Sequence, residues 1–495
     1  MKSQNCKVFI TLLIYFALFG ITKLIAQEKP SNGIIYIEAT VLDKETKAPL
    51  PFTNIIIENT SIGTMTNEEG KFELTISKDY ISSNVIFSFV GYQNTSISVK
   101  NFKNPEKLIF LQASSTSLDE IIVKVKNKYK ELIDKAITLI PDNYSQENVY
   151  LETYYRELTK IDNSYTKFID AASTVYYSAY DSSYDPEVSK YDYMQFKRLE
   201  YGIKKVPLPE PKDFVADTRD QAKIVALRKS NNLQKYKILN QSKKLQAIDS
   251  TDLKWLENNE IGGGPLRLTG ADKIKRRADF FNPKINSSYL FTLFGRSTYN
   301  NKPVYIISFA PKDSLQTKAV YKGEIVIDEQ SKAIISYQYQ LTKKAKKKLN
   351  QRFAAQLKTP ESIEKKSKKT FISRTTSLMD YKIYVTFSKY KGKWYLKRIK
   401  SNNTYKNTGD LFEAYSINTE SEIIINAVEL NNVSKFPTPN IFESTFSNPL
   451  SNHKLNYNQN FWKEYSALVP TGVVGKALED LESKSTLQEQ FEEKQ

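Results

Sequence analysis

Short runs of alternating apolar and polar residues, separated by turn signals, fill the sequence after residue 33. This pattern restricts the fold to one built mainly from β-strands. The turn Asn67-Glu-Glu-Gly70 precedes Phe72, Leu74 and Ile76, whose spacing of two places the three side chains on one face of a strand. Further short strands are predicted over residues 34–42, 54–58, 85–90 and 107–111. Together they predict a small antiparallel β-sandwich over residues 33–112.

Three segments of this region resemble the carboxypeptidase-regulatory-like domain. They are Val41-Leu-Asp-Lys-Glu-Thr-Lys-Ala-Pro-Leu-Pro-Phe52, Gly63-Thr-Met-Thr-Asn-Glu-Glu-Gly70-Lys-Phe72 and Ser88-Phe-Val-Gly-Tyr92. The resemblance covers about 80 residues and implies a prealbumin-like sandwich of seven strands, common in exported Bacteroidetes proteins. It also implies that Phe52, Phe72 and Tyr92 belong to the core. Such a resemblance indicates a fold and not a chemistry.

The region from residue 127 to 474 has longer strands, many of them rich in tyrosine. Apolar residues at helical spacing predict a helix over residues 128–139 that ends at Pro141, and short helices are expected over 218–229 and 251–257. Strands are predicted over 149–159, 165–179, 191–201, 288–299, 304–310, 319–327, 333–342, 370–390, 394–405 and 412–427.

The strand Gly323-Glu-Ile-Val-Ile-Asp328, with its turn and the strand that follows, resembles the half-barrel of periplasmic lipoprotein carriers and outer-membrane lipoprotein-sorting proteins. This resemblance covers about 100 residues and implies a sheet curled around an apolar cavity. The expected fold class is therefore mainly β: a prealbumin-like or Ig-like β-sandwich plus a larger α+β domain, residues 127–474, with a curved antiparallel sheet. A linker is expected over 113–126 and a polar helical tail over 475–495.

The beginning of the chain has the pattern of a secretory signal peptide. Lys2 and Lys7 precede an apolar run over residues 8–21, and Ala26-Gln27 follows as the expected cleavage point. The run is shorter than the roughly 20 residues that span a bilayer. We expect cleavage of residues 1–26, with an uncleaved membrane anchor as the alternative. Either form is exported to the periplasm or the periphery of the outer membrane, and cleavage would remove Cys6, the single cysteine.

The segment Ser117-Leu-Asp-Glu-Ile-Ile-Val123 is similar to one that follows the same domain in TonB-dependent outer-membrane receptors of the Bacteroidetes. About 370 residues follow it, which we expect to be too few for a plug and a barrel of about 22 strands. A linker or a last strand is the preferred interpretation. The whole chain more closely resembles uncharacterised exported Bacteroidetes proteins that carry the regulatory-like domain.

The chain is basic, with 72 Lys and Arg against 55 Asp and Glu, a net charge of +17. Basic residues gather at 273–277, 343–348, 365–369 and 397–400. Because an exported protein does not normally meet nucleic acid, none is expected as a partner. One hypothesis is peripheral association with an anionic membrane surface. The alternative is that the runs are solvated loops and strand edges, where lysine prevents edge pairing.

The single histidine, His453 in the polar stretch Asn452-His-Lys, argues against a zinc carboxypeptidase, which needs two imidazoles on its metal. It also argues against a Ser-His-Asp hydrolase, and a solvated loop histidine is expected. No catalytic residue, metal or cofactor is predicted. A metal-independent hydrolase using a carboxylate pair is an alternative. Its candidate residues are Glu152, Glu157, Asp170, Glu324 and Asp328.

Aromatic residues on the predicted strands are the remaining functional signal. Tyr305, Phe309, Tyr337 and Tyr339 are candidate ligand-binding residues that could line an apolar pocket, although ordinary core packing explains the same pattern. The expected function is non-catalytic: a cell-envelope protein that binds a lipid, a lipoprotein or another envelope component. A structural or interaction module of outer-membrane assembly and the hydrolase are the alternatives, and the oligomeric state is left open.

Overall fold

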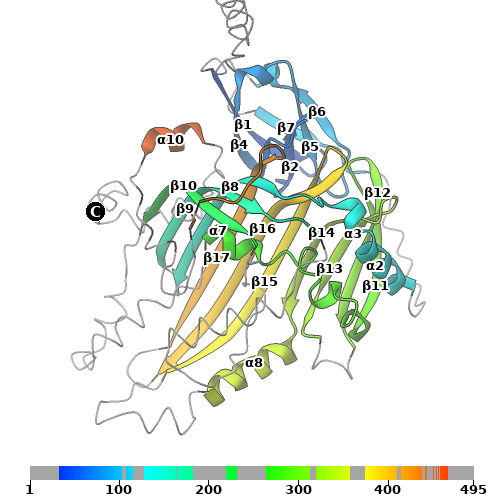
Figure 1. Ribbon diagram of the computed structural model, residues 1–495, viewed down its shortest axis with the longest axis vertical. Helices are drawn as coiled ribbons and strands as arrows, with labels where there is room; N and C mark the ends of the chain where they lie inside the picture. Colours follow the sequence, from blue (N-terminus) through cyan, green and yellow to red (C-terminus); the bar gives the residue numbers. More distant parts are fainter. Residues whose placement is uncertain are drawn as a thin grey trace, which may run out of the picture.

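The computed structural model in Figure 1 describes residues 33–102, 107–114, 128–162, 164–181, 219–230, 264–312, 319–356, 374–409, 414–437, 441–442, 450, 453, 455 and 458–465. The expected signal peptide, most of the expected linker and the expected polar tail lie outside these residues. So do the strand predicted over 191–201, the helix predicted over 251–257 and the basic run 365–369.

The first described region, residues 33–114, forms a β-sandwich of seven strands. They are β1 (Ile34–Asp43), β2 (Asn54–Ile57), β3 (Gly63–Met65), β4 (Lys71–Ser77), β5 (Asn84–Ser88), β6 (Thr95–Ser98) and β7 (Lys107–Leu111). One sheet has the order β4-β1-β7 and the other β3-β2-β5-β6. The 3-10 turns η1 (Lys78–Tyr80) and η2 (Val99–Asn101) complete the region.

The alternation in the sequence explains the core of this sandwich. Phe72, Leu74 and Ile76 are buried on one face of β4, and the ring of Phe72 meets that of Phe87 edge-on at 5.7 Å between centroids. One detail of the prediction is wrong, because β7 pairs with β1 in parallel. The chain reaches β7 after passing through β5 and β6 of the other sheet, so it returns beside β1 in the same direction.

The larger region is a single sheet of ten strands in the order β10-β9-β8-β17-β16-β15-β14-β13-β12-β11, with every neighbouring pair antiparallel. The strands are β8 (Val149–Ile161), β9 (Ser164–Tyr177), β10 (Gln221–Ser230), β11 (Tyr289–Tyr299), β12 (Lys302–Pro311), β13 (Tyr321–Asp328), β14 (Ile334–Leu341), β15 (Arg374–Tyr390), β16 (Lys393–Gly409) and β17 (Tyr415–Glu429). The mainly β fold class and the curved antiparallel sheet are confirmed.

Two elements differ from their predictions. Residues 218–229 were expected to form a helix, but most of them lie in β10, which pairs with β9 at the sheet edge. The basic run 343–348, expected to be a loop or strand edge, opens the helix α8 (Lys343–Gln356), which contacts β15. The predicted helix at 128–139 is confirmed as α2 (Lys128–Thr138), and α3 (Ile140–Asn143) follows it with Pro141 in its first turn.

The two faces of the large sheet carry different elements. On the inner face, which we define by Tyr337, Ile383 and Ile423, lie α2, α3, α7 (Gly264–Thr269) and the turns η5 (Asp279–Phe281) and η6 (Asn286–Ser288). On the outer face, defined by Glu324, Tyr384 and Arg398, lie the β-sandwich and the helix α10 (Gln459–Glu464). In Figure 1 the sandwich stands at the upper end of the sheet, with α10 beside it.

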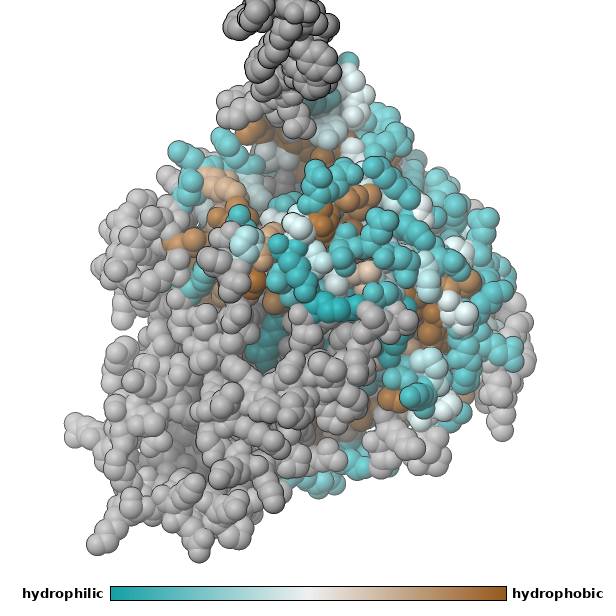
Figure 2. Space-filling view, viewed as in Figure 1, coloured by the Kyte–Doolittle hydropathy of each residue, from teal (hydrophilic) through white to brown (hydrophobic). Residues whose placement is uncertain are grey.

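The surface in the orientation of Figure 1 is mainly hydrophilic. Figure 2 shows apolar residues in separate small areas rather than in one broad patch over the described part of this face. Within the described residues, no helix is both long enough and apolar enough to cross a membrane.

Candidate functional site

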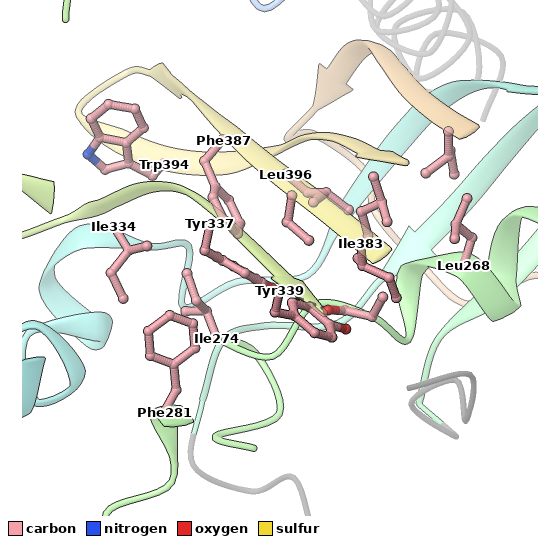
Figure 3. Packing of buried hydrophobic residues seen from close by; sticks show 14 of the residues in the cluster. Leu268, Ile274, Phe281, Ile334, Tyr337, Tyr339, Ile383, Phe387, Trp394 and Leu396 are labelled. Atoms are coloured by element: carbon pink, nitrogen blue, oxygen red, sulfur yellow. Dashed lines mark hydrogen bonds between the residues drawn. The ribbon is translucent and has the colours of Figure 1, made fainter. Parts of the chain in front are cut away.

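Three of the four aromatic residues proposed from the sequence come together on the inner face of the sheet. Phe309, Tyr337 and Tyr339 are almost fully buried. The segment 264–288 covers them, and the ring of Phe280 lies 4.2 Å from that of Phe309 and 5.6 Å from that of Tyr339. Figure 3 shows Phe281 of the same segment beside Tyr337. These rings are packed against protein on the inner face, so a ligand would reach them from that side only if the segment 264–288 moved.

Tyr337 also holds that segment by hydrogen bonds. Its hydroxyl accepts the backbone N–H of Lys273 at 2.8 Å and donates to the carbonyl of Ala271 at 3.2 Å. The fourth residue, Tyr305, lies apart and is half-buried, and its hydroxyl donates to Glu329 at 2.8 Å. The role of all four residues in ligand binding stays a prediction.

Two of the basic runs are largely buried, which corrects the alternative expectation that they are solvated loops and strand edges; association with an anionic membrane surface stays a prediction. Lys273 and Lys275 are each 1% exposed. Lys275 pairs with Asp220 at 2.6 Å, and Lys273 pairs with Asp279 at 2.6 Å. In the run 397–400, Lys397, Arg398 and Lys400 are likewise buried. Lys273, Lys275, Arg398 and Lys400 pair with carboxylates inside the protein, whereas Lys397 donates to the backbone carbonyl of Ile425.

The second of these runs borders a pocket between the sandwich and the outer face of the large sheet, with a volume of about 250 Å³. The sandwich contributes Phe52, Met65, Phe89 and Val90, and the sheet contributes Tyr299, Val326, Ser336, Tyr384, Thr386, Lys397 and Arg398. Most of these side chains are apolar. We call this hollow the interdomain pocket. Tyr337, one of the residues proposed from the sequence, also borders it.

Direct contacts hold the sandwich in place over the pocket. The Ser61 hydroxyl donates to the carbonyl of Val428 at 3.0 Å, and the backbone N–H of Gly91 donates to Thr298 at 2.8 Å. Lys400 on β16 pairs with Glu68 of the sandwich at 2.7 Å. The pocket is therefore bounded by two domains whose relative position is fixed by hydrogen bonds and an ion pair.

Phe52 occupies a strained backbone position at the mouth of this interface. Its φ of +62° lies in the left-handed region, which a bulky side chain rarely adopts. The resemblance implied a core residue, but its ring lies half-buried 3.9 Å from the guanidinium carbon of Arg398. The contact is a cation–π interaction that joins the two domains.

A row of side chains crosses the outer face of all ten strands. Cross-strand register places them opposite one another in the order Arg228, Asp170, Arg156, Glu422, Lys400, Tyr384, Gln338, Glu324, Ser308 and Thr292. The first five alternate in sign, so each charge has opposite charges beside it. This alternation offsets the cost of burying ions. Its charged members Asp170, Arg156, Glu422 and Lys400 are buried, and the row passes the interdomain pocket at Tyr384, Gln338 and Glu324.

The carboxylates proposed for a hydrolase are each engaged with partners of their own. Asp170 is fully buried and accepts from Arg156 at 2.8 Å and from Arg228 at 2.7 Å. Burial alone would raise the pKa of Asp170, but these two guanidinium groups hold it below its ordinary value. Glu157 pairs with Lys167 at 2.5 Å on the opposite face of the sheet.

The other three candidates lie apart from this pair. Burial raises the pKa of Glu152, which accepts from Thr174 at 3.0 Å. Glu324 accepts from Gln338 at 2.6 Å, and Asp328 closes a turn by accepting the N–H of Ser331. The structure therefore brings none of the five into a facing pair within the part of the chain that it describes.

His453 is half-buried rather than solvated, because its ring packs edge-on against Phe442 at 5.2 Å. Burial and the charge of Lys229 lower the pKa of His453. Among the described residues, no group of three or more His, Cys, Asp or Glu side chains is arranged to hold a metal ion.

Comparison with known proteins identifies the class of the first region. Residues 37–123 match the model of the CarboxypepD_reg-like domain family, which confirms the resemblance seen in the sequence. The match extends beyond residue 112, where the sandwich was expected to end, and includes the segment Ser117–Val123. The regulatory-like domain is therefore part of this chain.

Two TonB-dependent receptors are similar to this chain over limited lengths. Receptor P39 of Formosa agariphila is 27% identical over 24% of the chain and 11% of the receptor. SusC of Bacteroides thetaiotaomicron is 24% identical over 30% of the chain and 13% of the receptor. The chain thus matches only a small part of the length of these relatives.

Two solved structures share a distant likeness over a larger part of the chain. An outer membrane lipoprotein-sorting protein domain from Vibrio parahaemolyticus is 8% identical, with a TM-score of 0.22, and covers 62% of this chain and 95% of its own. A LolA superfamily protein from Nitrosomonas europaea is 8% identical, with a TM-score of 0.19, over 65% of this chain and 99% of its own.

Proposed function

We propose that the protein is a non-catalytic component of the cell envelope that binds the apolar part of a lipid, a lipoprotein or another envelope molecule in the interdomain pocket. The observation that carries this proposal is the pocket itself, an apolar hollow between two domains held in a fixed position. Apolar clefts at domain interfaces are common sites of ligand binding. Similarity to receptors of the outer membrane supports a place in the envelope.

The size of the pocket limits what it can hold. Its volume of about 250 Å³ lies below the roughly 300–1,000 Å³ of most small-molecule sites. A single acyl chain, or one or two apolar side chains of a protein, therefore fits better than a complete diacyl lipid. The packed inner face, where Phe280 fills the space beside Phe309 and Tyr339, leaves the outer face as the better place for a ligand.

The test uses the mature protein, exported and purified from a native-like host. Mass spectrometry of organic extracts should detect a stoichiometric acyl species, and the emptied protein should take up a fluorescent fatty acid. The substitution Ser336→Trp should abolish uptake by filling the pocket from β14. Gln340→Trp, on the same strand and face but outside the pocket, is the matched control.

Loss of uptake in both variants would show that the effect is not specific to the pocket. A protein that carries no extractable acyl species and takes up no added fatty acid would refute the proposal. It would leave partner binding through the β-sandwich as the leading function.

A further inference from the structure

The interdomain pocket contains a buried cation whose hydrogen bonds are incomplete. Arg398 is 2% exposed and donates from Nε to Glu422. Its Nη2 lies buried with no hydrogen-bond partner in the part of the chain that the structure describes. An unsatisfied buried donor on a charged group is costly, and most buried polar groups have partners. The unsatisfied Nη2 therefore indicates a missing acceptor in the pocket.

A neighbour of Arg398 has an unsatisfied atom as well. Thr386 lies directly opposite Arg398 across the β15–β16 pair, and its hydroxyl has no partner among the described residues. Both residues line the pocket. They lie on adjacent strands with Cβ atoms about 5 Å apart, and each has one free donor, which suits an acceptor with two oxygens. The side-chain oxygen of Asn54, which also lines the pocket without a partner among the described residues, is an acceptor and does not belong to this donor pair.

A second buried basic side chain, Lys397, also lines the pocket. Arg398 is balanced by Glu422, and Lys400 is balanced by Glu68 and Glu420. Lys397 is 3% exposed and donates to the carbonyl of Ile425 at 2.7 Å, and no described carboxylate pairs with it. Lys397 is therefore a lining residue that forms no ion pair with a described carboxylate, and Glu324 is the lining carboxylate that offsets its charge.

We infer that the ligand of the interdomain pocket is a monocarboxylate with a single apolar chain. Its carboxylate would accept from Arg398 Nη2 and the Thr386 hydroxyl, beside the amino group of Lys397. Its chain would lie against Met65, Phe89 and the other apolar lining residues. The ring of Phe52 packs against the Arg398 guanidinium, and the backbone conformation of Phe52 sets the position of that ring. The Arg398 donor is therefore oriented before the ligand binds.

This inference rests on the proposed function, and one experiment separates the two. The emptied full-length mature protein is titrated calorimetrically at about pH 8 with dodecanoate and, separately, with 1-dodecanol. Hydrogen bonds to charged groups contribute about 1.5–3 kcal/mol, so dodecanoate should bind roughly ten to a hundred times more tightly than the alcohol.

Two variants locate the carboxylate. Thr386→Val should weaken dodecanoate binding about fivefold and leave the alcohol unchanged. Arg398→Lys keeps a charge for Glu422 but removes the free donor, and it should reduce the preference for the acid by about tenfold. Thr292→Val, on the same face but outside the pocket, is the control and should change neither affinity. Circular dichroism and thermal unfolding confirm that each variant is folded.

Each outcome decides one of the two ideas. A preference for the acid that falls in both pocket variants supports the inference. Equal binding of acid and alcohol, or a preference for the acid that Thr386→Val and Arg398→Lys both leave intact, overturns the inference and retains the proposed function. Binding of neither compound overturns both.

Discussion

The substitution Lys397→Met tests whether a charge buried beside the interdomain pocket costs stability. Burial lowers the pKa of Lys397 from its ordinary 10.5 to about 7. This difference in pKa corresponds to a cost of about 5 kcal/mol for burying the protonated side chain, at 1.36 kcal/mol per pKa unit. The unfolded chain keeps this proton up to about pH 10.5, while the folded protein releases it near pH 7. The cost is therefore fully present below pH 7 and disappears as the pH rises toward 10.5.

At pH 7 the side chain is half protonated in the folded protein, which leaves a cost of about 4 kcal/mol. Methionine removes the charge and also the bond to Ile425, which is worth about 1 kcal/mol. We therefore expect Lys397→Met to be about 3 kcal/mol more stable than the wild type at pH 7 and within about 1 kcal/mol of it at pH 10.

Urea unfolding, followed by tryptophan fluorescence at both pH values, measures this difference. Lys389→Met on β15 is the control: Lys389 is exposed, and its replacement should change the free energy of unfolding little at either pH. An equal gain for Lys397→Met at pH 7 and pH 10 would refute the reasoning, and so would a loss of stability at pH 7.

Two further substitutions test the sheet. Asp170→Asn should lower the free energy of unfolding by about 3–5 kcal/mol, because the buried guanidinium of Arg156 and the half-buried one of Arg228 would lose their carboxylate. Glu69→Gln, which removes an exposed ion pair, should cost less than about 1 kcal/mol in the same urea experiment. Gly323→Ala should cost about 1–3 kcal/mol, because its Cβ would lie 1.9 Å from a backbone oxygen of β14. Faster amide hydrogen exchange in β13 and β14 would accompany that loss, and unchanged protection would contradict it.

The local sequence pattern is enough to predict most of the strands, but it fails for β10 at the edge of the large sheet. The period of two in residues 72–76 matches β4, and the strands predicted in the second region match observed strands except 191–201, which lies outside the described residues. Residues 218–229 misled because Ala222, Ile224, Ala226 and Leu227 fit a helical face as well as a strand. The segment forms a strand because it pairs with β9, and this pairing depends on tertiary structure rather than on local propensity.

The pocket could not be predicted from the sequence because its parts are far apart in the chain. Phe52 belongs to the sandwich and Arg398 to β16, and neither has a local pattern that indicates the other. Charges such as Lys400 were expected at the surface, because a sequence shows a charge but not its cross-strand partner. Its partners Glu68 and Glu420 come from two other elements.

The position of β17 in the sheet has a consequence for how the protein is made. This strand joins β8 to β16, and the contact between Thr159 and Thr419 closes a loop of 260 residues. Without β17 the strand order allows only two separate pieces to pair, the three strands β10-β9-β8 and the six strands from β16 to β11. Such long-range closure slows folding and leaves the edge of β8 open to other chains. Arg156 and Glu157 on β8 are charged, and charged residues on an open strand edge discourage aggregation in the time before β17 pairs with β8.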